Sequence, residues 1–187
     1  GNPLPHRAYT NAISNEDDAT GLITVVGWSN ENAVKWTVIL DDFGCPVVGS
    51  ATILHPMGAA TGVNNTGVIC GNALLGASAG GDGVVWVNGG PAETLAPTYS
   101  QWGNPRKGWP NDVNDDGLIV GYALFQACLW PNKDADPILL EDFLSKGKHA
   151  TFSSLGNAYA VNKSGEIVGH GSIGENLPSP PFLAVPD

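Results

Sequence analysis

A nine-residue motif recurs along this chain of 187 residues and constrains its fold more than any other feature. Three copies align without a gap: VNNTGVICG at 63–71, VNDDGLIVG at 113–121 and VNKSGEIVG at 161–169. A looser first copy, AISNEDDATGLITVVG at 12–27, carries an acidic insertion before its glycine. The leading apolar residues lie 50, 50 and 48 residues apart, at Ile13, Val63, Val113 and Val161. A period of about 40 to 50 residues is typical of β-propeller repeats, which have four strands each.

Each copy of the motif predicts a β-hairpin. Its Asn-x-x-Gly stretch suits a turn in which Asn bonds its own backbone and Gly adopts a positive φ. A β-rich run with tryptophan follows in three copies, at Trp36, Trp86 and Trp130, while Ala184 takes that position in the fourth. We expect these runs to be third strands with their indole rings in the core, because large aromatic side chains pack between sheets. Fourth strands are expected at 46–54, 90–97 and 136–144.

These patterns predict an all-β fold, a β-propeller built from about four repeats of four-stranded antiparallel sheets within one domain over 1–187. The repeats are expected at approximately 8–56, 57–105, 106–154 and 155–187. Because the last copy ends soon after its third strand, residues 2–10 (NPLPHRAYT) are expected to close the propeller as an edge strand of the last sheet. A fragment of a larger ring, or one ring completed by two chains, is the alternative.

The acidic balance of the chain limits its partners. Eighteen Asp and Glu against eight Lys and Arg give a formal net charge of -10, which repels nucleic acid phosphates and anionic membrane surfaces. We therefore expect no nucleic acid partner. No apolar run approaches the roughly 20 residues that span a bilayer, so membrane insertion is not expected either. Of the three cysteines, Cys70 and Cys128 occupy apolar positions of the repeat, which predicts that both are buried.

The repeat carries a family resemblance. NAYAVNKSGEIVGHGS at 157–172 is similar to A-x-A-I-N-x-x-G-x-V-V-G, and QACLW, DGVVW and NAVKW look like degenerate forms of H-A-F-L-W. Over nearly its whole length the chain thus resembles the bacterial extracellular HAF-repeat family, although the His is missing from every copy and the Phe remains only as Phe182. The resemblance implies a β-propeller in a secreted or cell-surface protein, and it brings no catalytic residues.

The third copy contains a candidate metal site. Asp112, Asn114 and Asp116, followed by Gly117, form the start of a calcium-loop pattern, D-x-N-x-D-G, in which alternate oxygens converge on one cation. The glutamate that completes such a loop is replaced by Ala123, and the other copies have no carboxylates at these positions. A turn is the favoured interpretation, and Ca²⁺ binding is the alternative.

Aromatic residues outside the repeat positions suggest a ligand site. Tyr99, Trp102 and Trp109 lie in a Gly/Pro-rich connector at 99–110, where exposed rings can stack on sugars. Burial of the same rings over a sheet is the favoured interpretation, a sugar-binding site is the alternative, and Trp28 is a second, weaker candidate for such a site.

The recurring residues all serve packing and turns, which favours a non-enzymatic extracellular module that binds a carbohydrate or another surface protein. One alternative is a hydrolase or lyase with acidic residues in the central channel, since propellers can hold paired carboxylates there. Another is a component of a surface filament or lattice formed by self-association through open sheet edges.

Overall fold

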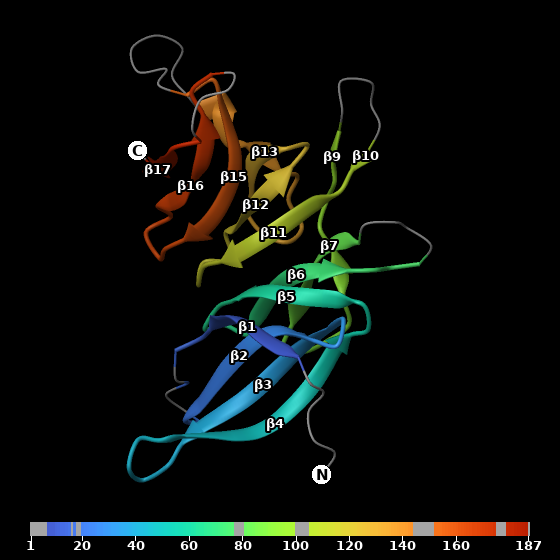
Figure 1. Cartoon of the computed structure of the whole chain (residues 1–187), viewed down its shortest axis with the longest axis vertical. Coiled ribbons are helices and arrows are strands. Elements are labelled where there is room, and N and C mark those ends of the chain that lie inside the picture. The colour runs from blue at the N-terminus through green and yellow to red at the C-terminus, as the bar shows by residue number, and fades with distance from the viewer. Residues whose placement is uncertain are drawn as a thin grey trace. The chain divides into compact units, whose positions relative to one another are not determined.

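The structure is a computed structural model that describes residues 7–15, 17, 20–76, 81–99, 105–143, 152–174 and 179–186 (Figure 1). Within these ranges the regular elements are antiparallel β-strands and one turn of 3-10 helix, η1 (Leu140–Phe143). The predicted all-β class is confirmed. No helix in this part of the chain is long and apolar enough to cross a membrane.

Four sheets follow one another along the chain, and in each sheet consecutive strands are neighbours. The first sheet contains β1 (Ala8–Ile13), β2 (Leu22–Ser29), β3 (Asn32–Leu40) and β4 (Pro46–His55). The second contains β5 (Gly58–Val63), β6 (Val68–Ala73), β7 (Asp82–Val87) and β8 (Glu93–Thr94). The third contains β11 (Gly108–Val113), β12 (Ile119–Ala123), β13 (Gln126–Trp130) and β14 (Ile138–Leu139). The fourth contains β15 (Ser154–Val161), β16 (Ile167–Ser172) and β17 (Pro181–Ala184), while β9 (Thr98–Tyr99) and β10 (Pro105–Arg106) form a separate short ribbon.

The predicted fourth strands are only partly right. β4 covers the expected segment, but β8 and β14 have two residues each, and the rest of the last expected strand is the helix η1. Pro137 directly precedes β14, and Pro91 and Pro97 lie two and three residues from the ends of β8; since proline cannot donate an N–H to a ladder, these residues limit how far the two strands can pair.

The N-terminal segment does not extend the last sheet. Tyr9 pairs with Trp28 and Thr10 with Gly27, so this part of the chain is the edge strand β1 of the first sheet. Pairing of β1 with β2 is favoured over pairing with the last sheet, because β1 and β2 belong to one hairpin and closing a short loop costs little entropy. Residues 2–6 of the expected strand lie outside the described residues. Each of the four sheets is open in the described part of the chain, with an edge strand on either side.

A β-bulge recurs at one position in the first strand of every sheet. The bulged residues are Asn11, Thr61, Asn111 and Tyr159. Each bulge brings the backbone against the glycine that ends the repeat motif. A Cβ added to Gly71 would lie 2.1 Å from the carbonyl oxygen of Ala59, and the matching distances at Gly27, Gly121 and Gly169 are 1.9, 2.1 and 2.1 Å. Only glycine fits at this position, because another side chain would collide with a neighbouring main chain.

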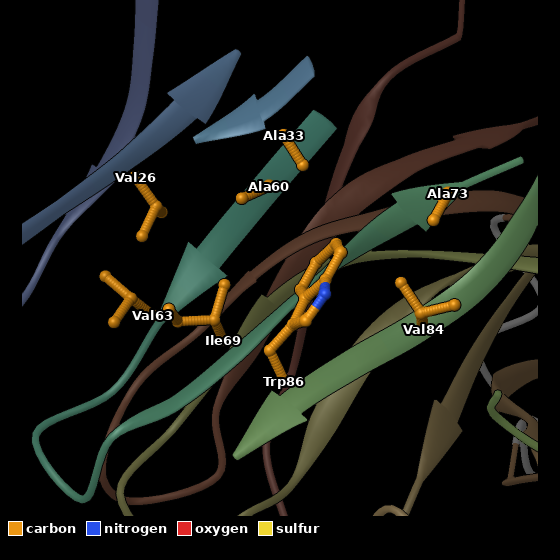
Figure 2. Packing of buried hydrophobic residues seen from close by; sticks show 8 residues of the cluster. All are labelled: Val26, Ala33, Ala60, Val63, Ile69, Ala73, Val84 and Trp86. Atoms are coloured by element: carbon orange, nitrogen blue, oxygen red, sulfur yellow. The ribbon is translucent and has the colours of Figure 1, made fainter. Parts of the chain in front are cut away.

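The chain divides into two compact units, Gly1–Thr94 and Leu95–Asp187, each with two of the four sheets. The single domain expected over 1–187 stays a prediction. In the first unit, eight buried side chains form a cluster between the first and second sheets (Figure 2). Val26 and Ala33 come from the first sheet, and the fully buried ring of Trp86 lies among the side chains of the second.

Both units pack their sheets in the same way. We call the face that carries Trp36, Trp86, Trp130 or Ala184 the tryptophan face, and the opposite face, with Val26, Cys70, Val120 or Val168, the valine face. In the first unit the valine face of the first sheet covers the tryptophan face of the second. In the second unit Val120 and Ala127 on the valine face of the third sheet contact Ile167 and Phe182 on the tryptophan face of the fourth.

The repeat tryptophans and two cysteines lie in the core, as predicted. Trp36, Trp86 and Trp130 are 6, 0 and 0 % exposed, and Cys70 and Cys128 are both 0 % exposed. Burial raises the pKa of the Cys128 thiol to about 12, so it is protonated at neutral pH and serves packing rather than nucleophilic chemistry. Cys45 is exposed, and the cysteines form no disulfide in the described structure.

Candidate functional site

The Asn-x-x-Gly turns have the predicted geometry. The amide oxygen of Asn114 accepts the backbone N–H groups of Asp116 and Leu118 at 3.1 and 3.0 Å, and Asn64 holds its turn in the same way. The turn glycines all have positive φ, from 66 to 83°. In the looser first copy the role of the asparagine falls to Asp17, whose carboxylate accepts the N–H of Thr20 at 2.8 Å.

The three proposed calcium ligands are engaged with the protein in different ways. One carboxylate oxygen of Asp112 accepts the N–H of Val161 in the fourth sheet at 2.9 Å. The side-chain nitrogen of Asn114 donates to the carbonyl of Asn162 at 3.1 Å, while its oxygen is used by its own turn. Asp116 is exposed. Among the residues with described positions, no three His, Cys, Asp or Glu side chains gather where they could hold a metal ion. The contacts indicate a turn and a sheet-to-sheet link, and Ca²⁺ binding stays the alternative interpretation.

Burial dominates the electrostatics of Asp112. It raises the pKa of this carboxyl above its ordinary value of 3.8, and the N–H groups of Val161 and Val113 offset part of that rise. The surroundings therefore favour the protonated form of Asp112 more than water does.

The aromatic connector is only partly described. Tyr99 lies in β9, where its backbone pairs with Pro105, and Trp102 lies outside the described residues. Trp109 lies in β11 and not in a loop, so its expected place in the connector is wrong. Strand β11 begins at Gly108. Trp109 pairs with Tyr122 of the neighbouring strand β12, and the centroids of the two rings lie 5.2 Å apart.

A matching aromatic pair occupies the same two positions in the first sheet. Tyr9 of β1 pairs with Trp28 of β2, and their rings stack with centroids 4.7 Å apart and 17° between planes. Tyr9 is 52 % exposed. The second and fourth sheets have Ala59 with Asn72 and Asn157 with His170 at these positions. Aromatic pairs therefore occur in the first and third repeats.

An open groove of about 430 Å³ lies beside Trp28. Its lining comes from the ends of the first and second sheets: Trp28, Glu31, Met57, Gly58, Ala59, Asn72, Leu74 and Gly81. Glu31 is exposed in the turn between β2 and β3, and Met57 is 54 % exposed in the link to the second sheet. The groove thus combines an aromatic ring with a carboxylate, an amide and apolar surface.

Left-handed backbone shapes the rim of this groove. Asn30, Glu31 and Met57 have φ values of 46, 68 and 57°, a region that Glu and Met side chains rarely adopt. Hydrogen bonds hold the strained residues: the carbonyl of Glu31 accepts the N–H of Gly58 at 2.6 Å, and that of Met57 accepts the N–H of Leu74 at 2.9 Å. At Asn30 and Glu31 the positive φ is what a two-residue hairpin turn requires, and Leu124 and Phe125 share it in the third sheet, so the turn itself fixes this part of the rim.

Sequence reasoning named Trp28 only as a second candidate and missed Tyr9. A signal for the pair exists. In the first and third copies an aromatic residue stands four positions before the leading apolar residue, and another follows the last glycine of the motif. The signal needs the strand register, because only the bulge places these two positions opposite each other.

Comparison with known proteins gives no match: no family model matches the chain, and no match is found among the curated proteins or the solved structures. Function is therefore inferred from the groove and the aromatic pairs.

Proposed function

We propose that this chain is a carbohydrate-binding module and that the groove beside Trp28 takes the sugar. The observation that carries this proposal is the stacked Tyr9–Trp28 pair, half exposed at Tyr9, next to a groove that also presents Asn72 and Glu31. Aromatic rings offer flat apolar faces that suit the C–H face of a sugar ring. Amide and carboxylate groups supply donors and acceptors for the hydroxyls.

The size and rigidity of the groove support this ligand class. Its volume of about 430 Å³ lies within the roughly 300–1,000 Å³ of small-molecule sites, most of which are formed before the ligand binds. The hydrogen-bonded rim provides that preformed shape. Because the chain has a net charge of -10 and Glu31 lines the groove, a neutral sugar fits better than an acidic one.

The repeat architecture suggests what kind of protein carries the groove. The four sheets would be blades of the HAF-repeat type in a β-propeller that two chains complete, in a protein secreted or held at the cell surface. Support comes from the four meander sheets, in each of which one copy of the motif joins the first and second strands, and from the resemblance of those copies to HAF repeats. Another surface protein is the alternative ligand for the same groove.

The enzymatic alternative lacks a supporting observation. A hydrolase or lyase of the expected kind would use carboxylates that face one another across a bound substrate. Asp112, whose pKa is raised, accepts a backbone N–H from Val161 and links two sheets, which is a structural role.

Glycan-array screening followed by titration calorimetry with the best neutral ligand tests the proposal. Tyr9→Ala should weaken binding about tenfold, since an aromatic contact contributes roughly 0.5–1.5 kcal/mol and 1.4 kcal/mol is tenfold. Asn72→Ala should weaken binding by up to about tenfold, since a hydrogen bond contributes roughly 0.5–1.5 kcal/mol. Alanine is compatible with the fold at the position of Tyr9, because Ala59 occupies the equivalent position in the second sheet. Phe125→Ala is the matched control, since Phe125 is an aromatic residue 90 % exposed in the turn between β12 and β13 and does not line the groove.

Two results would contradict the assignment of the groove. The first is an array without a sugar ligand. The second is binding that Trp102→Ala or Trp109→Ala removes while Tyr9→Ala leaves it intact, which would move the ligand to the connector.

A further inference from the structure

The tryptophan face of the first sheet is apolar and uncovered at its rim. Ile13, Val48 and Ile53 share this face by strand register and are 64, 60 and 61 % exposed. The centre of the face, formed by Val34, Trp36 and Val38 of β3, is buried. At the position of Ile13 the other three sheets have Val63, Val113 and Val161, which are 7, 3 and 8 % exposed. The same residue position is therefore core in three sheets and surface in the first. Exposed apolar side chains on both edge strands, β1 and β4, mark this face as an interaction surface.

The valine face of the fourth sheet is uncovered as well. Val168 and Leu183 pair directly across β16 and β17 and are 45 and 62 % exposed. At the position of Val168 the first and third sheets have Val26 and Val120, both 0 % exposed. Tyr159, the bulged residue of this sheet, is 52 % exposed and lies against the ring of His170.

These two surfaces are the two halves of a contact that already occurs inside each unit. There, the valine face of one sheet covers the tryptophan face of the next. A polar link accompanies the apolar contact: the bulged Asn11 donates to the carbonyl of Ala60 at 2.8 Å, and the bulged Asn111 donates to the carbonyl of Ala158 at 2.7 Å. Tyr159 and Thr10 occupy the corresponding donor and acceptor positions on the two uncovered surfaces.

We propose that this chain associates head to tail, with the valine face of the fourth sheet of one copy packed on the tryptophan face of the first sheet of a second copy. The partner is a second copy because it presents the complementary face, and because the contact continues the packing seen within both units. Such a contact is heterologous, so it joins two different surfaces of identical chains. Salt should strengthen it, since each copy has a net charge of -10 and screening reduces their repulsion.

Light scattering over a range of protein concentrations tests the proposal. The mass should rise above the 19.4 kDa of one chain as concentration increases, and it should rise further in moderate salt. Ile13→Asp and Val168→Asp should each weaken association at least about tenfold, since a charge is then placed in an apolar contact. Both positions are exposed in the single chain, so each variant should keep its cooperative melting transition. Phe125→Asp is the control, because this exposed residue lies on neither surface.

Mixing the two variants gives the decisive result. Each keeps one intact surface, so an equimolar mixture of Ile13→Asp and Val168→Asp should form pairs although either variant alone is monomeric. A mass of one chain at every concentration would overturn the proposal, and so would a mixture that stays monomeric. Association that survives in either variant alone would also overturn it, because it would require a different surface.

Discussion

Substituting Gly71 by alanine should destabilise the first unit far more than an alanine normally does. The added Cβ would lie 2.1 Å from the carbonyl oxygen of Ala59 and 2.9 Å from the Cα of Ala60, where ordinary contact begins near 3.4 Å. These are backbone atoms, which cannot rotate away as a side chain can. The strand β5 must therefore move by more than about 1 Å from β6, and it carries Ala60 and Val63 of the core cluster with it.

The size of the effect follows from what this movement breaks. Overpacking that forces a backbone shift costs roughly 1–3 kcal/mol, and each weakened ladder hydrogen bond adds about 0.5–1.5 kcal/mol. We expect Gly71→Ala to lower the free energy of unfolding by roughly 3–5 kcal/mol, among the larger effects of single substitutions.

Two glycines in the same unit are matched controls. Gly44 has a φ of 75° and open space around it, so Gly44→Ala should cost only the left-handed backbone penalty of about 1–2 kcal/mol. Gly49 has its nearest contact at 3.4 Å, so Gly49→Ala should be neutral or stabilise by up to about 1 kcal/mol. Urea unfolding followed by tryptophan fluorescence measures all three. A loss at Gly71 no larger than that at Gly44 would refute the close-approach explanation.

Three further predictions concern the third repeat and the cysteines. Because the pKa of Asp112 is raised in the folded state, the stability of the protein should fall as pH rises from about 3.8, the ordinary pKa, through the raised pKa. Asp112→Asn should remove this loss, so the melting temperature of the variant minus that of the parent should increase between pH 3 and pH 7. Calcium should leave the melting temperature unchanged, since Asp112 and Asn114 are engaged in hydrogen bonds, and a rise that Asp116→Ser abolishes would contradict this. A thiol reagent should modify Cys45 in the native protein and should reach the buried Cys128 only after unfolding, as mass spectrometry can show.

Residues that act within one repeat were predictable from the sequence. The period located the four sheets, and the turn chemistry of Asn and Gly gave the hairpins, since these effects depend on a few adjacent residues. The burial of Trp86 and Trp130 followed from their recurrence in β-rich runs. Composition and local pattern were sufficient for the fold class.

Features that depend on register were not predictable. The aromatic pair Tyr9–Trp28 joins residues whose pairing is set by the bulge at Asn11, which the pattern of side chains does not reveal. The short strand β14 depends on Pro137, and the role of Asp17 depends on how the acidic insertion folds into the turn. A one-residue change of register exchanges the two faces of a strand, so the candidate groove required coordinates.

The glycine contact also separates what the repeat must keep from what it can vary. The collision at Gly71 and its counterparts involves the carbonyl of the residue that precedes the ladder partner of the glycine, and the side chain of that residue takes no part in it. Tyrosine, alanine, tryptophan and asparagine accordingly stand at that preceding position in the four copies. The backbone at this position is therefore fixed by the glycine contact, while the side chain can differ from repeat to repeat. New binding preferences can arise at these sites without disturbing the architecture that holds them.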